Sequence, residues 1–400
     1  ESKVQNFWED EDIYSKTNDL RANGPQYSFL DGPPYCSGKI HLGTTWNKVI
    51  KDTLLRYKSM NGFSLRRQAG WDTHGLPIEH KVEQLLGIES KQEIEEKYGI
   101  DNFINKCKEF AMENKVAMTE QFKSLGVWMD WDNPYMTLDP KYMESAWWTL
   151  KKAHEKNLLT RDQRVISWCP HCGTALAAAE IEYEEKADPS IYIKFPVKGE
   201  ENTYFLVWTT TPWTLCANVA LCVNPNETYV KCLSKGYNFI VAKALANNIL
   251  GEDYEVVEEY TGKDLEYKEY EQLLPFFEVN KKAFFVTCDN YVTMSDGTGI
   301  VHIAPAFGAD DAQVGKNYNL PYLNPVGEDG KYLEGPWAGT LVFDADKEVI
   351  AYLKENDKLF KKQKMVHNYP HCWRCDSPLL YYSKPSYYLK VTEIKDDIIA

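Results

Sequence analysis

The sequence predicts a mixed α/β fold in which a parallel sheet is interrupted by an inserted β-barrel-like domain, with a cysteine-containing ribbon at the junction. Near the N-terminus, a short apolar run, a loop and a helix follow one another twice, which is the order typical of parallel α/β sheets. Two Cys-x-x-Cys motifs lie far apart in the chain, and several β-prone runs lie between them. An insertion that begins and ends at one metal site would account for both features.

Size and composition agree with several packed domains. The chain has 400 residues, of which 44% are hydrophobic, and this is enough for two or three cores. No run approaches the roughly 20 apolar residues of a membrane span, and the first residues resemble no signal peptide, so we expect a soluble, cytoplasmic protein. The net charge of −14 argues against a generally basic nucleic-acid binder. Any bound RNA would need local basic patches or segments outside this chain.

The first repeat surrounds the loop Asp31–Thr44. Tyr27–Leu30 before this loop is a β-prone run. After the loop, apolar residues recur at helical spacing between Trp46 and Tyr57, and Asn61–Gly62 marks the helix end. The loop therefore connects a strand to a helix.

The start of that helix is a candidate nucleotide site, because its free N–H groups and positive dipole end attract phosphate. Gly38 and Gly43 would let a nucleotide approach the backbone, and His41 could donate a hydrogen bond to a phosphate oxygen. The alternative is an ordinary turn with a helix cap at Thr44. The loop is neither a P-loop nor a GxGxxG turn.

In the second repeat, the strand-like run Phe63–Arg67 leads into Gly70–Glu79. Functional loops of parallel sheets lie at the carboxyl ends of the strands, so Asp72 should lie beside the His41 loop. Alternatively, Asp72 caps the next helix.

The following segments are interpreted as scaffold. Residues 89–125 read as mostly helix, and Asp139-Pro140 predicts the N-cap and first residue of a helix that runs to about Lys156. Large aromatic side chains are usually buried, so we expect four tryptophans to belong to the core: Trp128, Trp131, Trp147 and Trp148.

The cysteines indicate a metal site. Each Cys-x-x-Cys motif can offer two thiolates to one tetrahedral zinc ion. A redox disulfide is the alternative for one motif alone, whereas two motifs together favour a structural zinc site. His171 and His371 lie beside the motifs, so a histidine could replace one cysteine. The four candidate ligands are Cys169, Cys172, Cys372 and Cys375.

If both motifs bind one ion, the chain between them must leave that place and return to it. We therefore divide the chain into 1–160, the first half of the parallel-sheet domain; 161–186, the first motif with a connecting segment; 187–365, the inserted domain; and 366–400, the second motif and the return to the first domain. The β-prone runs of the insertion predict a barrel-like β domain with a few helices. These runs are 191–195, 204–208, 237–242 and 283–286.

A second set of polar residues lies within the insertion. Three consecutive threonines at 209–211 follow an apolar strand. They are either ordinary strand residues or a row of hydroxyls that face a pocket and bind a polar ester. Further along, His302 is followed by Asp310 and Asp311, which could bind a metal ion in a hydrolase or cap the next helix.

Two motifs resemble those of a known family. His41-Leu42-Gly43, preceded by Gly32-Pro33-Pro34, resembles the HIGH signature of class I aminoacyl-tRNA synthetases, and Gly70–Glu79 resembles a block typical of the isoleucyl members. The valyl, leucyl and methionyl members carry different residues there. The resemblance covers nearly the whole chain and implies a Rossmann-type catalytic sheet interrupted by an editing domain. One residue departs from the family: Thr44 replaces its second histidine, and threonine cannot carry a positive charge.

For the first site, the resemblance implies ATP-dependent activation of isoleucine and its transfer to tRNA(Ile), the reaction of an isoleucine–tRNA ligase. His41, Gly43 and Thr44 would contact ATP, which binds with Mg²⁺. Asp72 would hold the α-ammonium group of isoleucine, and Pro33 would line its side-chain pocket. The implied partners are ATP, L-isoleucine and tRNA(Ile), and we expect a monomeric enzyme with structural zinc.

For the insertion, the resemblance implies a hydrolytic editing pocket that needs no metal. Thr209, Thr210, Thr211 and Asn218 would line it with His302, and Asp311 would hold the α-ammonium group of the misattached amino acid. One missing methylene is worth only about 1–3 kcal/mol, a limit that the isoleucyl enzymes illustrate, so a pocket for isoleucine also admits valine. The implied second activity is hydrolysis of valyl-tRNA(Ile).

Three alternatives remain. The chain could be a hydrolase that only deacylates mischarged tRNA, a valyl-type synthetase, or a non-catalytic zinc-ribbon module that binds RNA. Residues 70–79 argue against valyl specificity, and the acidic net charge argues against the RNA-binding module. We find no Lys-Met-Ser-Lys-Ser loop and no anticodon-binding helices, so we expect the N-terminal portion of a longer enzyme that cannot charge tRNA without its other half.

Overall fold

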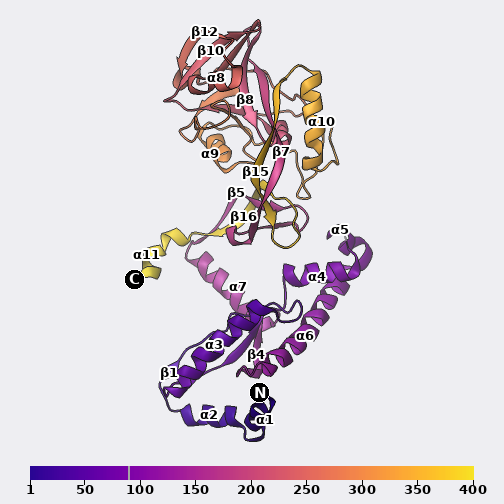
Figure 1. Cartoon of the computed structure of the whole chain (residues 1–400), viewed down its shortest axis with the longest axis vertical. Helices are drawn as coiled ribbons and strands as arrows, with labels where there is room; N and C mark the ends of the chain where they lie inside the picture. Colours follow the sequence, from indigo (N-terminus) through magenta and orange to yellow (C-terminus); the bar gives the residue numbers. More distant parts are fainter. Residues whose placement is uncertain (89–90) are drawn as a thin grey trace. The chain divides into compact units, whose positions relative to one another are not determined.

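The computed structural model describes residues 1–88 and 91–400. The chain divides into two compact units (Figure 1). The first unit comprises residues 1–160 and 389–400, and the second comprises residues 161–388. Both contain helices and strands, so the predicted α/β class is confirmed in this general form.

Two pairs of short parallel strands lie in the first unit. Strand β1 (Gln26–Tyr27) pairs with β2 (Ser64–Leu65), and β3 (Gln68–Trp71) pairs with β4 (Asp130–Met136). The prediction of a strand over Tyr27–Leu30 is wrong beyond its first residue. Leu30 is 78% exposed, so its apolar side chain does not face a core, and the chain has already left the strand to form the loop.

The helices of the first unit largely follow the predicted periodicity. The predicted helix, with apolar residues between 46 and 57 and its end at Asn61-Gly62, is α3 (Leu42–Met60), which has Asn61 as its C-cap. The predicted helical range 89–125 begins at residues 89–90, which lie outside the described residues, and from Lys91 onward it is almost entirely helical. The unit contains α1 (Ser2–Asp10), α2 (Ile13–Arg21), α4 (Leu76–Leu86), α5 (Lys91–Glu93), the π-helix η1 (Ile94–Tyr98), α6 (Ile100–Ser124), α7 (Pro140–Glu155), η6 (Val391–Glu393) and α11 (Lys395–Ile399).

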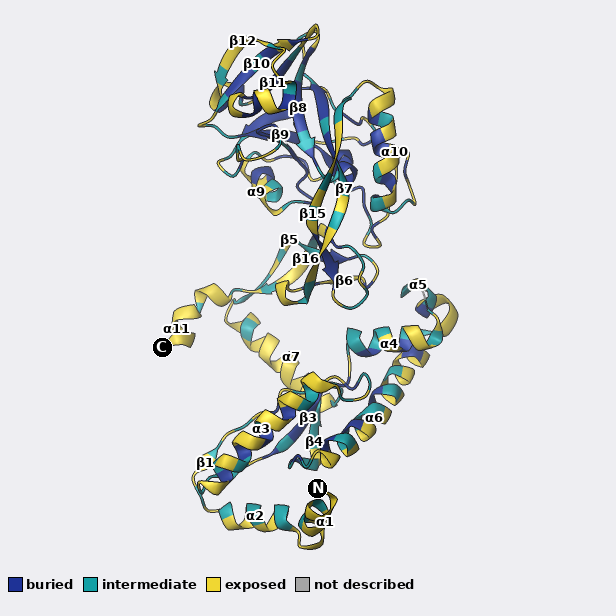
Figure 2. Ribbon diagram, viewed as in Figure 1, coloured by how far each residue is buried: buried dark blue, intermediate teal, exposed yellow. Residues whose placement is uncertain are grey.

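Helix α7 begins as the sequence predicts. Asp139 is its N-cap and accepts a hydrogen bond from the N–H of Lys141, and Pro140 is the first helical residue. The predicted burial of two tryptophans on this helix is wrong: Trp147 is 71% exposed and Trp148 is 60% exposed. No residue of α7 is buried (Figure 2). None of the described residues packs over these two indole rings closely enough to bury them.

The second unit is built on three sheets. The largest has six strands in the order β12-β10-β11-β8-β7-β15, and two smaller ones have the orders β13-β9-β14 and β16-β5-β6. Their bounds are β5 (Leu159–Cys169), β6 (Thr174–Ala175), β7 (Ile181–Pro196), β8 (Thr203–Thr209), β9 (Ala220–Val223), β10 (Thr228–Ser234), β11 (Tyr237–Ala242), β12 (Glu255–Thr261), β13 (Phe285–Cys288), β14 (Ile300–Ile303), β15 (Leu359–Cys372) and β16 (Leu380–Leu389). The predicted β-prone runs at 191–195, 204–208 and 237–242 lie within β7, β8 and β11, whereas only the second half of the run at 283–286 lies in β13.

A long antiparallel ribbon of two strands, β7 and β15, brings together the two ends of the chain segment that lies between them. Strands β7 and β15 pair from Ile181 opposite Cys372 as far as Ile193 opposite Leu359, and Ala187 lies opposite Val366. Residues that are far apart in the sequence are therefore neighbours at the base of the ribbon (Figure 1). The chain between them begins and ends in adjacent strands.

Short helices connect the sheets of the second unit. They are η2 (Ala178–Glu180), η3 (Pro212–Ala217), η4 (Lys243–Leu245), α8 (Ala246–Leu250), η5 (Gly262–Leu265), α9 (Ala309–Asn317) and α10 (Val342–Glu355). Figure 2 shows that the buried residues concentrate in the strands of the large sheet and in the segments packed on it. Across residues 1–88 and 91–400, no helix is long and apolar enough to cross a membrane.

Candidate functional site

The first candidate site lies at the start of α3. His41 is the N-cap of this helix, and its Nδ1 accepts a hydrogen bond from the N–H of Gly43 at 3.1 Å. Thr44 completes a reciprocal cap, because its Oγ1 accepts from the N–H of His41 at 2.9 Å. With Nδ1 acting as an acceptor, the neutral ring carries its proton on Nε2. His41 and Gly43 are exposed, so an anion can approach this helix start.

Asp72 lies against the same loop. Its N–H donates to the carbonyl of Pro34 and its carbonyl accepts from the N–H of Cys36, both at 2.9 Å. Its Oδ1 accepts from the hydroxyl of Thr137 at 3.1 Å. Asp72 does not cap the next helix, since α4 has Gly75 as its N-cap without a side-chain bond. Pro33 is the partly exposed neighbour of Pro34 in this loop.

A buried ion pair fastens this region and was not predicted from the sequence. Asp31 is fully buried and pairs with Lys48, which is 1% exposed, and with Lys51. The same carboxylate accepts from the N–H of Gly70 at 3.0 Å. Burial lowers the pKa of Lys48, while the charge of Asp31 opposes this effect. Asp31 thus ties the loop to α3 and to β3, the strand that leads into Asp72.

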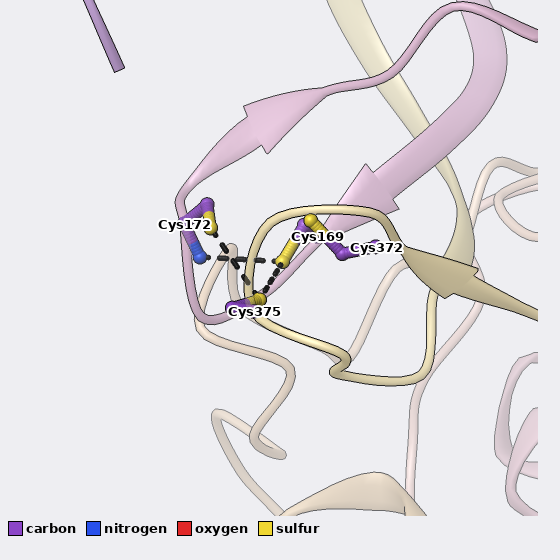
Figure 3. A group of neighbouring side chains, drawn as sticks. All are labelled: Cys169, Cys172, Cys372 and Cys375. Atoms are coloured by element: carbon purple, nitrogen blue, oxygen red, sulfur yellow. Dashed lines mark hydrogen bonds between the residues drawn. The ribbon is translucent and has the colours of Figure 1, made fainter. Parts of the chain in front are cut away.

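The four predicted cysteine ligands come together in the second unit. Their sulfurs lie within 4.8 Å of one another, and Figure 3 shows the side chains directed toward a common centre from two loops. Cys375 Sγ is 3.5 Å from the sulfurs of both Cys169 and Cys172. Four sulfurs bound tetrahedrally to zinc at about 2.3 Å lie about 3.8 Å apart, so this donor set fits a zinc ion. Hydrogen bonds from the Cys169 and Cys172 thiols lower the pKa of Cys375, whereas the hydrogen bonds of Cys172 with Cys169 and Cys375 raise the pKa of Cys172.

Both cysteine loops use the same backbone turn. Gly173 follows the first motif with φ +62° and Asp376 follows the second with φ +57°. In the first loop, the N–H of Cys172 also points at the sulfur of Cys169 at 3.3 Å. The neighbouring histidines do not join the group: His371 Nδ1 lies 3.0 Å from the carbonyl of Tyr369, and His171 Nδ1 lies 4.0 Å from Cys172 Sγ. Among the described residues, the four cysteines form the only such cluster.

The second candidate pocket contains a chain of hydroxyls. Thr209 Oγ1 and Thr211 Oγ1 are 3.3 Å apart, and Thr211 Oγ1 and Thr214 Oγ1 are also 3.3 Å apart. Thr214 Oγ1 lies 3.0 Å from Nε2 of His302. Thr214 was not among the predicted residues. It lies three positions after Thr211, in η3. Its contact with His302 could not be foreseen, because it depends on where β14, the strand that carries His302, lies in the fold.

His302 is buried, and its Nδ1 has no hydrogen-bond partner among the described residues. Burial lowers the pKa of this imidazole to about 4, because the charged form is poorly solvated there. The ring is therefore neutral at physiological pH. An unpartnered buried nitrogen is costly, and such an atom is often paired by a ligand or water.

Asp311 lies in the first turn of α9. Its Oδ2 accepts from the N–H of Ala304, two residues after His302, at 2.9 Å. Burial raises the pKa of this carboxyl to about 7. Gly308 leaves the space that the carboxyl occupies, since a Cβ there would lie 2.6 Å from Asp311 Cγ. No basic side chain is paired with Asp311 in the described part of the chain.

The remaining predicted residues are placed differently. Asn218 is buried, donates to the carbonyl of Ala220 at 2.9 Å and accepts from the hydroxyl of Tyr270 at 2.7 Å, so its amide supports the backbone. Thr210 is partly buried between Thr209 and Thr211. Asp310 is exposed. The alternative of a metal cluster with His302 and the two aspartates finds no support among the described residues.

Comparison with known proteins identifies the family of the chain. Residues 3–400 match the family model described as tRNA synthetases class I (I, L, M and V). The chain belongs to this family.

Several curated relatives cover the whole chain. An isoleucine–tRNA ligase of Methanothermobacter marburgensis is 54% identical over 405 residues, which are 100% of this chain and 38% of the relative. Proteins of the same name are 51% identical in Pyrococcus horikoshii and 48% identical in Methanocaldococcus jannaschii, covering 39% and 40% of those relatives. A solved LeuRS–tRNA–LeuAMS complex from Agrobacterium radiobacter matches 96% of this chain and 51% of that chain at 18% identity and a TM-score of 0.38. The chain thus spans about two-fifths of the length of these curated relatives.

Proposed function

We propose that this chain takes part in the ATP-dependent activation of isoleucine and its transfer to tRNA(Ile), and in the hydrolysis of valyl-tRNA(Ile). The observation that carries this proposal is the 54% identity to an isoleucine–tRNA ligase over the full chain. The relatives give no support to a valyl-type synthetase, since those reported above share the isoleucine name. We further propose a monomeric, cytoplasmic enzyme, and light scattering of the purified protein tests the monomer.

In the first reaction, the carboxylate of isoleucine attacks the α-phosphorus of ATP, and pyrophosphate leaves; the 3′-terminal adenosine of tRNA then accepts the acyl group. We assign the helix start at His41, Gly43 and Thr44 to the phosphates of ATP with its Mg²⁺. The exposed start of α3 and the Nε2–H of His41 support this assignment. Asp72, held against the same loop, would bind the α-ammonium group, with Pro33 beside the side chain. Catalysis would rest on positioning and charge stabilisation.

In the second reaction, water attacks the ester carbonyl of valyl-tRNA and the terminal ribose hydroxyl leaves. Asp311 would bind the α-ammonium group, because its desolvated carboxylate lacks a cationic partner in the described chain. The hydroxyl chain of Thr209, Thr211 and Thr214 with the neutral His302 would orient the ester and the water. Thr210 and Asn218 complete the proposed pocket, Asn218 through its support of the backbone. No step requires a metal ion.

We also propose the finer architecture: a Rossmann-type catalytic half (1–160), a zinc ribbon formed by 161–186 with 366–400, and an inserted barrel-like editing domain (187–365). The paired strands β7 and β15 at the boundary support the insertion. The four cysteines would hold a structural zinc ion, which stabilises the junction of the two loops.

Metal analysis tests the zinc site. We expect one zinc ion per chain in the wild-type protein and a loss of zinc in Cys375→Ser, because serine does not replace a thiolate ligand. Cys107→Ser is the control, since Cys107 lies outside the cluster. Equal zinc contents in the wild-type protein and the two variants would contradict the assignment of the four cysteines as zinc ligands.

Hydrolysis assays test the editing role. Valyl-tRNA(Ile) and isoleucyl-tRNA(Ile) are compared as substrates for the chain and for Asp311→Ala. We expect hydrolysis selective for the valyl ester, with the selectivity lost in the variant. Selective hydrolysis without isoleucine-dependent pyrophosphate exchange would fit a chain that edits but cannot activate by itself. Binding of tRNA with no hydrolysis of either ester would instead favour a non-catalytic RNA-binding role.

A further inference from the structure

We infer that Asp346, on helix α10, is a positioning residue that holds the threonine-containing turn of the second site in its working conformation. This inference deepens the proposed editing function and rests on it. It concerns a residue that lies far along the chain from Thr211 and outside both sequence motifs of the site.

The first observation is a backbone clamp around Trp213, the second residue of η3. Asp346 Oδ1 accepts a hydrogen bond from the N–H of Trp213 at 2.8 Å. On the other side of the same residue, the hydroxyl of Tyr332 donates to the carbonyl of Trp213 at 2.7 Å. Side chains from two other segments therefore fix both polar groups of one peptide residue. Tyr332 is itself 2% exposed, so this bond is shielded from water.

The clamped residue lies between the two halves of the proposed pocket. Its neighbour Thr214 donates to the carbonyl of Thr211 at 2.8 Å and contacts His302. The indole of Trp213 packs edge-on against Phe307, with ring centroids 4.8 Å apart. Phe307 belongs to the turn that starts at Ala304, the residue whose N–H binds Asp311. A shift of Trp213 would therefore disturb the threonine side and the aspartate side together.

The type of residue at 346 also needs an explanation. The first N–H groups of a short 3-10 helix have no partner within the helix. An uncharged acceptor would be enough to bind the N–H of Trp213. A carboxylate makes a stronger, charge-assisted bond there. Burial raises the pKa of Asp346 to about 7, so keeping an acid at this place costs free energy. The bond to the turn is the compensating contact that the structure provides.

Three variants of the full chain test the inference, with Asp344→Ala as the matched control because Asp344 is an exposed aspartate on the same helix. Asp346→Ala removes the acceptor, Asp346→Asn keeps an acceptor without charge, and Tyr332→Phe removes the other half of the clamp. Two quantities are measured: kcat and KM for valyl-tRNA(Ile) hydrolysis, and amide hydrogen exchange of the peptide that contains residues 211–217.

For Asp346→Ala we expect kcat to fall by about tenfold to a hundredfold, the effect of losing one charge-assisted hydrogen bond, and exchange at 211–217 to accelerate to a similar degree. KM should rise as well, because the turn that binds Asp311 packs against Trp213 through Phe307. Asp346→Asn keeps a neutral acceptor and should recover part of the loss, and Asp344→Ala should match the wild-type protein. If Asp346→Ala does not fold, the Asn and Phe variants still decide: Tyr332→Phe should accelerate exchange at 211–217.

Wild-type kcat and wild-type exchange in both Asp346→Ala and Tyr332→Phe would overturn the inference. A parallel loss in Asp346→Asn would also overturn it, because the charge rather than the held turn would then matter. If the wild-type chain hydrolyses neither ester, the proposed function fails. The exchange measurement is independent of that failure and still shows whether Asp346 holds the turn.

Discussion

Asp311 and His302 are held near neutrality by the same physical cause acting on opposite charges. Burial raises the pKa of the carboxyl to about 7 and lowers that of the imidazole to about 4, because a desolvated site disfavours whichever form is charged. At physiological pH the ring is therefore neutral, and the Asp311 carboxyl, which lacks a counter-ion, is only partly ionised. The ammonium group of the proposed aminoacyl ester would supply the counter-charge and favour the carboxylate form.

The pKa of Asp311 has a consequence for stability. The unfolded carboxyl titrates near 3.8 and the folded one near 7, so between these pH values the folded state holds a proton that the unfolded state has released. Raising the pH through this window therefore destabilises the fold. Asp311→Asn has no proton to lose. We expect it to gain about 2 kcal/mol over the wild-type protein between pH 4 and pH 8, since the partly exposed carboxyl carries only part of the full desolvation penalty.

Denaturant unfolding at pH 4, 6 and 8 measures this gain. Asp310→Asn is the control, because Asp310 is the exposed neighbour on the same helix turn. The same variant should lose valyl-selective hydrolysis, so that stability rises as function falls. A stability difference between Asp311→Asn and the wild-type protein that does not vary with pH would show that the carboxyl is not desolvated.

At the scale of elements, α3 is the part of the first unit on which the proposed nucleotide site depends. Its N-terminus carries His41, while Lys48 two turns later is buried against Asp31 and lies over the rings of Trp71 and Phe122. The carboxylate of Asp31 also binds the N–H of Gly70. The helix, the loop before it and strand β3 are therefore held by one buried charge cluster.

Removing Asp31 should destabilise the first unit strongly. Asp31→Ala leaves the ammonium group of Lys48 buried without its counter-ion, and the loss of one partner of a buried pair costs about 3–5 kcal/mol. Glu11→Ala breaks an ion pair with Lys16 in which both side chains are more than half exposed, and it should cost less than about 1 kcal/mol. Denaturant unfolding compares the two. Adding Lys48→Met to Asp31→Ala should restore part of the stability, and a further loss in the double variant would contradict the argument.

The elements also show which features the sequence could predict. The start of α7 was predictable because Asp139 and Pro140 are a local capping signal. Strands β7, β8 and β11 and part of β13 were predictable because β-branched and aromatic runs are local as well. Strand β1 was overestimated because Leu30 looks apolar in the sequence although its side chain faces solvent. The same local argument failed for Trp147 and Trp148, whose burial depends on what packs against α7.

Contacts between distant segments could not be predicted. Asp346 reaches Trp213, Thr214 reaches His302, and Lys48 is buried on Asp31, and none of these pairs has a spacing pattern that marks it. The two cysteine motifs are the exception, because the chemistry of zinc itself demands four ligands. The sequence therefore predicted candidate residues for the second pocket, and the structure shows which distant residues contact them.

At the scale of the whole molecule, each unit has its own core. Among the described residues, every apolar cluster lies within one unit: the clusters around Trp71 and Phe103 belong to the first, and those around Phe205, Phe285 and Leu379 belong to the second. The cluster around Phe205 is the most extensive and contains many fully buried side chains. The free energy of unfolding should therefore be divided unequally between the units.

Calorimetry of the chain should accordingly show two thermal transitions, the lower one from the first unit. All four cysteines of the proposed zinc site lie in the second unit, and a metal that binds only the folded state raises the transition temperature of the part that holds it. A zinc chelator should lower the upper transition by several degrees and leave the lower one in place, whereas Asp31→Ala should act on the lower transition alone. One cooperative transition that moves with both changes would mean that the units unfold together, and the separate cores would then not act as independent folding units.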